Sequence, residues 1–121
     1  MATDYDLCFV TAGDRETAAA LADGLLKERL AACVTALPGA ESAYWWKGKI
    51  ERSAEVVLLI KTRAALREDV VRFVRTRHSY ENPEIIFTPI AAGSPDYLDW
   101  LGANTRFSPG AARPDQENND L

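Results

Sequence analysis

The chain has 121 residues, of which 47% are hydrophobic, and it carries a formal net charge of −4. This length fits one domain with a real core, and a pI near 5.0 argues against a nucleic-acid-binding surface, which needs clustered positive charge. There is no long apolar run of the length that spans a membrane and no secretory signal at the start, so we expect a cytoplasmic protein without membrane association.

The first elements predicted along the chain are a strand over residues 5–11 and a helix over residues 15–30. Asp14 is a favourable N-cap residue, and apolar side chains recur after it at helical spacing. These side chains are Ala18, Leu21, Ala22, Leu25, Leu26 and Leu30. The spacing predicts an amphipathic helix that packs on a sheet.

The longest predicted feature is a β-hairpin from Leu30 to Thr62, in which two strand-like runs flank Lys47-Gly48-Lys49. Gly48 supplies the permissive backbone of a tight turn, and Pro38, which cannot donate a ladder hydrogen bond, marks a bulge, a bend or an edge. One face of the second run is apolar except at Arg52, with Ile50, Ala54, Val56, Leu58 and Ile60. Its other face starts polar and becomes apolar, so we expect this run to begin in solvent or against a partner and to end buried on both sides.

A second helix is predicted over residues 63–77, with Leu66, Val70, Phe73 and Val74 facing inward. Its outer face carries Arg63, Arg67, Arg72 and Arg75. We interpret this arginine-rich side as a solvated face, because runs of charge usually are. An anion-binding site is the alternative.

The last predicted elements are a turn over residues 78–84, a strand over residues 85–90 and a short helix over residues 95–104. Ser94-Pro95-Asp96 is a strong helix start, with a capping hydroxyl, a proline at the first helical position and an acid in the first turn. After Arg106 the sequence is rich in Ser, Pro, Gly, Asn and Asp, which predicts a disordered tail.

The predicted order β-α-β-β-α-β, followed by a terminal helix, indicates an α+β protein with a ferredoxin-like, split βαβ antiparallel sheet and helices on one face. We expect one such domain over residues 1–106 and a disordered tail over residues 107–121. The strands carry too many apolar residues for the other sheet face to be wet, and Tyr44, Trp45 and Trp46 near the hairpin tip are large side chains to leave exposed. We therefore expect an oligomer.

The residues that offer chemistry are few. His78 is the only histidine, and a single histidine needs a thiolate or carboxylate from elsewhere, including a neighbouring subunit, to build a transition-metal site. A structural role is the alternative for His78 and for Cys33, whose thiol behaves as a compact hydrophobe. Lys61 ends an otherwise apolar face and either snorkels or lines a cleft. No nucleophile with an adjacent base is visible, which argues against an enzyme.

Several short motifs follow one another along the chain. They are Leu30-Ala31-Ala32-Cys33-Val34, Pro38-Gly39, Tyr44-Trp45-Trp46-Lys47-Gly48, Lys61-Thr62, His78-Ser79-Tyr80-Glu81-Asn82-Pro83-Glu84-Ile85 and Tyr97-Leu98 with Trp100-Leu101. Together, in this order, these motifs resemble the CutA family of divalent-cation tolerance proteins. The resemblance covers roughly residues 5–106. It implies a ferredoxin-like subunit in a tight homotrimer, similar to PII signal-transduction proteins, in which long strands pair between subunits. It also implies a role in tolerance of copper and other divalent metals.

Only one of the copper-ligand positions that the resemblance implies holds a matching residue in this sequence. The resemblance implies a cysteine at the end of the first strand and two consecutive histidines before the Tyr-x-x-Pro-Glu turn. Here these positions hold Val10 and the pair Arg77-His78, so only His78 matches. We therefore expect copper, if it binds, to bind weakly.

Two hypotheses for function follow. The first is a non-catalytic trimeric protein of the divalent-metal response that needs no cofactor, with copper or another divalent cation bound by His78, Glu84 and Cys33. The second is a PII-like sensor of a small anionic metabolite, with Lys61 and arginines as the anion partners. Lys61, Tyr80 and Glu81 are the candidate small-molecule residues, and we expect both sets to lie in a cleft between subunits.

Overall fold

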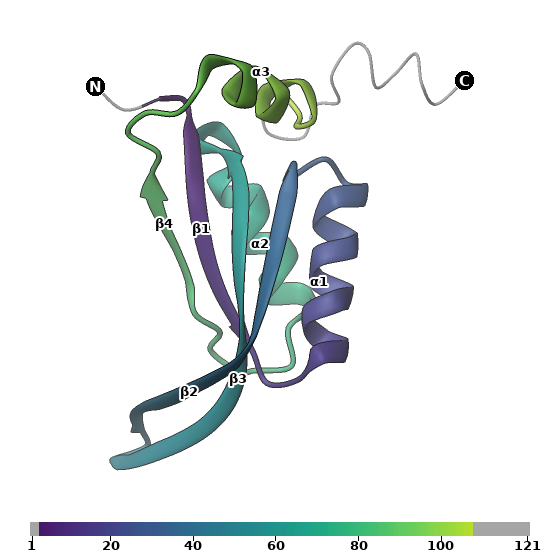
Figure 1. Ribbon diagram of the computed structural model, residues 1–121. Coiled ribbons are helices and arrows are strands. Elements are labelled where there is room, and N and C mark those ends of the chain that lie inside the picture. The colour runs from purple at the N-terminus through teal and green to yellow at the C-terminus, as the bar shows by residue number, and fades with distance from the viewer. Residues whose placement is uncertain (1–2, 108–121) are drawn as a thin grey trace.

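A computed structural model describes residues 3–107 and contains four strands and three α-helices (Figure 1). In chain order the elements are β1 (Tyr5–Ala12), α1 (Arg15–Lys27), β2 (Cys33–Trp46), β3 (Lys49–Arg63), a 3-10 turn (Ala64–Leu66), α2 (Arg67–Arg77), β4 (Ile85–Pro89) and α3 (Pro95–Ala103). The strands form one antiparallel sheet in the order β2-β3-β1-β4. The predicted ferredoxin-like α+β order is confirmed.

Helices α1 and α2 cover one face of the sheet, and α3 lies across one end of it (Figure 1). The core lies between the sheet and the first two helices. Its buried side chains are Cys8, Val10, Ala12, Ala18, Leu21, Leu25, Leu30, Ala31, Val56, Leu58, Ile60, Leu66, Val70, Phe73 and Val74. The opposite sheet face carries half-buried apolar residues on β1 and β3, so the sheet is not covered there by residues 3–107.

Helix α1 starts where the sequence predicts and ends three residues earlier. The Asp14 carboxylate accepts a 2.7 Å hydrogen bond from the Thr17 backbone, which is the expected N-cap. The helix ends at Lys27 rather than Leu30 because Arg29 takes a left-handed backbone with φ of 57°. Leu30 still packs in the core, but Leu26, predicted to face inward, is 39% exposed.

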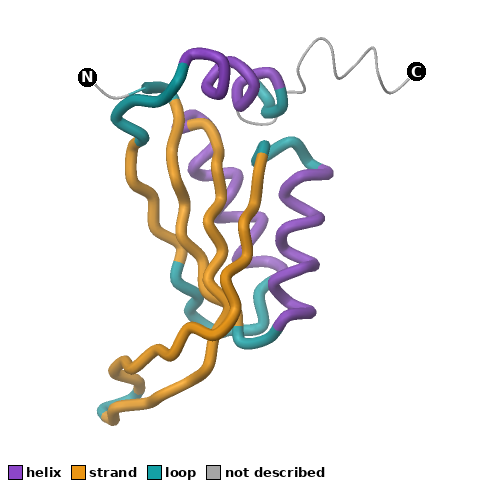
Figure 2. The backbone as a smooth tube through the Cα atoms, in the orientation of Figure 1, coloured by secondary structure: helices purple, strands orange, loops and turns teal. Residues whose placement is uncertain are grey.

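The hairpin of β2 and β3 extends beyond the rest of the sheet and curves away from it (Figures 1 and 2). Its two-residue turn is Lys47-Gly48, where both residues have positive φ, as the favoured hairpin turns require. The predicted irregularity at Pro38 is a bulge, since the strand register shifts between Leu37 and Ala40.

The prediction for the second hairpin strand is confirmed at its start, which is exposed, and is wrong at its end. Ile50 is 60% exposed and Ala54 is also exposed, although both share the face of the buried Val56. The reason is that β1 pairs with β3 only from Val56 to Arg63, so the earlier residues of β3 have no sheet partner except β2. The end of β3, predicted to be buried on both faces, is buried on one face only, and Lys61 is half-buried on the other.

The predicted arginine-rich face of the second helix is only partly a solvated face. Arg67 forms a bidentate ion pair with Asp6, a β1 residue that is fully buried. Arg63 donates to the Gly102 carbonyl at 2.8 Å and to the Thr105 hydroxyl at 2.9 Å, which ties β3 to the end of α3. The other two arginines, Arg72 and Arg75, are exposed as expected.

The C-terminal part of the described chain follows the prediction closely. Helix α3 begins at Pro95 with the Ser94 hydroxyl as its cap and ends one residue early, at Ala103. Phe107, the first residue of the predicted tail, lies with its ring 5.5 Å from the Arg63 guanidinium. The rest of the predicted tail, residues 108–121, lies outside the described residues, and its disorder stays a prediction. None of the helices between residues 3 and 107 has the length and apolar content needed to cross a membrane.

Candidate functional site

A cleft of about 770 Å³ opens where the projecting hairpin faces the turn that precedes β4. Its walls come from three segments far apart in the sequence: the end of β1, both hairpin strands and the turn itself. The lining residues are Thr11, Ser42, Ala43, Tyr44, Trp45, Trp46, Glu55, Ser79, Tyr80, Glu81, Asn82, Pro83 and Glu84. This cleft has the volume of a small-molecule site.

One hydrogen bond joins the two sides of the cleft. The Tyr80 hydroxyl donates to Glu55 Oε2 at 2.7 Å, and Glu55 is only 6% exposed. Burial, with the Glu55 carboxylate as a second cause, raises the pKa of Tyr80 to about 12. The phenol therefore keeps its proton at neutral pH and acts as the donor. In the part of the chain that the structure describes, no basic residue forms an ion pair with Glu55.

His78 supports the turn from behind the cleft rather than lining it. Its Nδ1 accepts a 3.0 Å hydrogen bond from the Tyr80 backbone, so Nε2 carries the proton and donates to the Thr11 carbonyl at 2.7 Å. Its ring also packs 4.7 Å from the Tyr80 ring. Both ring nitrogens are occupied in this arrangement. A metal ion would have to displace one of these hydrogen bonds before it could bind the imidazole.

Cys33 and Lys61 lie elsewhere. They face each other across β2 and β3, with Lys61 Nζ 3.9 Å from Cys33 Sγ. Lys61 Nζ also lies 5.7 Å from the Tyr97 ring, so this pair belongs to the α3 end of the sheet. Lys61 lies well along β3 from Glu55, at a separation of about 20 Å for an extended strand.

The structure thus brings together some of the predicted site residues and separates others. Tyr80, Glu81 and Glu84 line one cleft, and Lys61 is distant from them within the chain. No group of three or more His, Cys, Asp or Glu side chains between residues 3 and 107 is placed to hold a metal ion. The metal ligand set stays a prediction that needs donors from outside the single chain.

Sequence reasoning missed Glu55 as a site residue. Alternation along the strand assigns it only to a polar face, yet it is the buried carboxylate at the base of the cleft. The available signal was its position, a carboxylate directly before the apolar run Val56-Val57-Leu58. Tyr44 and Trp46, which the sequence suggests as interface or core residues, form a wall of the cleft.

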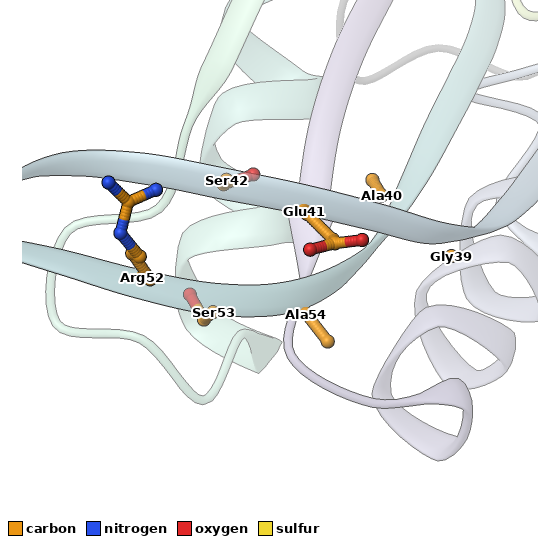
Figure 3. Close-up of a pocket in the computed structure, with 7 residues that line it drawn as sticks. All are labelled: Gly39, Ala40, Glu41, Ser42, Arg52, Ser53 and Ala54. Carbon is orange, nitrogen blue, oxygen red and sulfur yellow. The ribbon is translucent and has the colours of Figure 1, made fainter.

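A second, smaller hollow of about 400 Å³ lies along the hairpin at its bend (Figure 3). It is lined by Gly39, Ala40, Glu41, Ser42, Arg52, Ser53 and Ala54. Glu41 and Arg52 come from opposite strands, and both are exposed. Because no buried charged group lines this hollow, the cleft around Glu55 is the stronger candidate site.

The charge of the cleft restricts what it can bind. Three carboxylates line it, from Glu55, Glu81 and Glu84, and its lining includes no lysine, arginine or histidine. An anion would meet uncompensated negative charge there. The second hypothesis places Lys61 and Tyr80 together in a cleft between subunits, and within one chain Lys61 does not line the cleft around Glu55.

Comparison with known proteins identifies the family. Residues 7–104 match the family described as CutA1 divalent ion tolerance protein. The chain belongs to the CutA1 family. The divalent-cation tolerance protein CutA of Pectobacterium atrosepticum is 45% identical over 109 residues, which cover 86% of this chain and 99% of that protein. The resemblance stated from the motifs is confirmed.

Solved structures of CutA1 proteins share this fold. The crystal structure of CutA1 from Oryza sativa matches with a TM-score of 0.85 at 41% identity, covering 88% of this chain and 98% of that one. The divalent cation tolerance protein from Thermus thermophilus matches with a TM-score of 0.82 at 40% identity, covering 84% of this chain and 98% of that one. Matches of this quality over most of both chains support the α+β fold described above.

Two plant relatives are longer than the matched region. The chain spans 56% of the Oryza sativa protein CutA 1 and 54% of the Arabidopsis thaliana protein CutA, at 44% and 45% identity. Both plant proteins are named chloroplastic, and a structural relative from Archaeoglobus fulgidus, 37% identical, is named periplasmic. Members of the CutA1 family therefore carry different compartment names, and a cytoplasmic location for this chain stays a prediction.

Proposed function

We propose that this protein is a non-catalytic homotrimer that acts in the tolerance of divalent metal ions, copper among them. The observation that carries the proposal is membership of the CutA1 family over residues 7–104, since its bacterial relatives are named divalent-cation tolerance proteins. The proposal includes a cytoplasmic location.

The uncovered sheet face supports assembly with further copies of the chain. Leu7, Phe9, Val57 and Leu59 are half-buried on this face, and Ile86 of β4 is 55% exposed. The hairpin tip adds Trp45 at 73% exposure. Apolar area on this scale marks an interaction surface, and the motif resemblance implies three copies. Light scattering should give three times the 13.3 kDa chain mass, and a monomer at micromolar concentration would contradict the proposal.

The state of the only histidine supports a non-catalytic role. Each ring nitrogen of His78 is bound to backbone, one to Tyr80 and one to Thr11, so no lone pair is free to take a proton from a nucleophile. The thiol of Cys8 is fully buried, and burial raises its pKa to about 12, which makes it inert.

Copper binding can be tested by calorimetric titration of the chain and of His78→Ala. We expect divalent copper to bind at micromolar affinity or more weakly, because Val10 and Arg77 replace the family's donors and His78 is already hydrogen-bonded. Cys33→Ser and Glu84→Gln test the other two predicted ligands. A nanomolar, His78-dependent site, one per chain, would contradict the expected weakness and would mean that a second chain completes the coordination.

An anion sensor is the less supported candidate. Lys61 is the cation that it names together with arginines, and the half-buried Lys61 side chain faces Cys33 and Tyr97 rather than the cleft. Titration with nucleotides and organic acids tests it, and saturable binding that Lys61→Ala abolishes would favour it over the metal-response proposal.

A further inference from the structure

We propose that the cleft between the hairpin and the turn before β4 binds an organic cation of the alkylammonium class, with its ammonium group at Glu55 and its alkyl chain along the aromatic wall. Of the residues in this proposal, only Glu84 also belongs to the predicted metal ligands. The proposal can therefore be tested independently of metal tolerance.

The first argument is the buried carboxylate. Glu55 is 6% exposed, and the neutral hydroxyl of Tyr80 binds one of its two oxygens. Burying a charge is costly unless a counter-charge and hydrogen bonds compensate it. Within residues 3–107 no cation pairs with Glu55. A cationic ligand in the cleft would supply both the charge and the hydrogen-bond donors.

The second argument is the aromatic wall. Tyr80 is hydrogen-bonded to Glu55, and Tyr44 and Trp46 line the cleft farther out along the hairpin. Trp46 pairs with Lys49, about 20 Å along the strand from Glu55. Aromatic faces attract cations within about 6 Å of the ring centre and also cover methylene groups. The chain shows this attraction nearby, since Lys47 Nζ lies 5.5 Å from the Trp46 ring. A carboxylate at one end of the cleft and aromatic rings along its length match a ligand that has a charged group and a hydrocarbon chain.

The third argument is the remaining charge of the lining. Glu81 and Glu84 are exposed lining residues, and no basic side chain lines the cleft. The cleft therefore repels anions and favours a ligand with more than one positive charge. Its volume of about 770 Å³ suits a small organic molecule.

A bare divalent ion fits this cleft less well. Such ions need several oxygen, nitrogen or sulfur ligands gathered within about 2.0–2.6 Å. The described residues contain no group of three candidate ligand side chains. The three lining carboxylates, Glu55, Glu81 and Glu84, lie at separate points of the cleft. They suit an organic cation that carries its positive charges at separate points of an alkyl chain.

The test is a titration followed by tryptophan fluorescence, because Trp46 lines the site. The probes are 1,4-diaminobutane and spermidine, compared at matched ionic strength with the neutral 1,4-butanediol and with citrate. We expect a saturable change with both amines and none with the diol or citrate. Absence of saturable binding by the amines, or an equal response to the diol, would overturn the proposal.

Variants assign the binding to Glu55. Glu55→Gln removes the charge with little change in shape and should weaken amine binding at least ~10-fold, which is about 1.4 kcal/mol. The matched control is Glu51→Gln, an exposed carboxylate of the same strand that does not line the cleft, and it should bind amines as the parent does. If Glu55→Gln fails to fold by circular dichroism, the pair Glu81→Gln and Glu84→Gln tests the same charge dependence.

Two other outcomes would overturn the proposal in favour of a different role. If amines do not bind and Glu55→Gln dissociates the oligomer, a basic residue of a second chain neutralises Glu55. If copper or magnesium gives a Glu55-dependent response and the amines give none, the cleft is a metal site. The light-scattering and copper measurements on the parent chain decide the proposed function independently of these results.

Discussion

The Tyr80 hydroxyl and the Glu55 carboxylate form a 2.7 Å hydrogen bond that links the turn before β4 to the hairpin strand β3. The two partners lie 25 positions apart in the sequence. This bond holds the two walls of the cleft together, because Tyr80 belongs to one wall and Glu55 to the other. The turn side of the bond is itself fixed by His78, whose Nδ1 accepts from the Tyr80 backbone.

Removing the phenol hydroxyl should therefore destabilise the fold measurably. Tyr80→Phe leaves the buried Glu55 without this donor, and we expect a loss of about 1–2 kcal/mol in the free energy of unfolding, measured by urea titration. Tyr44→Phe is the control, since its hydroxyl contacts Ser53 at an exposed position and its loss should change stability less. Equal losses in the two variants would show that the Tyr80–Glu55 hydrogen bond contributes no more to the free energy of unfolding than the exposed Tyr44–Ser53 contact does.

The packing of α1 against α2 depends on the absence of a side chain at Gly24. A Cβ built there would lie 2.3 Å from Cζ of Phe73, a buried ring that is also covered by the Arg77 guanidinium at 3.9 Å. Alanine gains about 1 kcal/mol in helix propensity over glycine, but overpacking a buried contact costs about 1–3 kcal/mol. We expect the clash to dominate, so Gly24→Ala should lower the melting temperature.

A second substitution tests this explanation. Phe73→Leu shortens the opposing side chain, so its combination with Gly24→Ala should cost less than the sum of the two single changes. Strict additivity, or a Gly24→Ala protein more stable than the parent, would show that the helices can separate without cost.

The two cysteines should differ in reactivity. Cys8 is fully buried in the core, and burial raises the pKa of its thiol to about 12, whereas Cys33 is half-buried beside Lys61. Thiolates rather than thiols react with disulfide reagents. We expect Cys33 alone to react with an aromatic disulfide reagent in the native protein, and both thiols to react after unfolding in guanidinium.

Cys33→Ser should remove the native reaction, and Cys8→Ser should leave it unchanged. Fast modification of the Cys33→Ser protein would mean that β1 opens locally and exposes Cys8.

The elements of this fold were predictable because each has a local chemical signal. Asp14 and Ser94 cap their helices as their side chains suggest, and Gly48 and Pro38 mark the hairpin turn and the bulge. The early end of α1 was not predictable from periodicity, because the apolar spacing continues to Leu30 and the backbone leaves the helix before it.

The position of the site was harder to predict from the sequence, because the site is built largely from β-strands. Alternation along a strand assigns each residue to a face, but it does not show how far the neighbouring strand extends. Ile50 shares the alternation of the core residues and yet lies past the end of β1. The candidate small-molecule residues Lys61 and Tyr80 are expected in one cleft between subunits, and within a single chain Lys61 packs near Tyr97, at the other end of β3 from Glu55.

The N-cap of α1 gives the chain a dependence of stability on acid pH. Hydrogen bonding from Thr17 is the main cause that lowers the pKa of Asp14 below its ordinary value. A carboxyl group with a lower pKa in the folded state stabilises the fold fully above its unfolded pKa and loses this effect as the pH falls through the folded pKa. We therefore expect the contribution of Asp14 to be complete at neutral pH and to be lost progressively below about pH 4.

Comparison with Asp14→Asn isolates this contribution, because asparagine also caps helices but does not titrate. The difference in unfolding free energy between parent and variant, measured in urea at a series of pH values, cancels the effect of the other carboxylates. We expect the difference to be constant near neutral pH and to shift against the parent as the solution becomes acidic. Asp14→Ala, which removes the cap altogether, should be less stable than Asp14→Asn at every pH. A pH-independent difference between parent and Asp14→Asn would mean that the Thr17 hydrogen bond does not favour the charged carboxylate in solution.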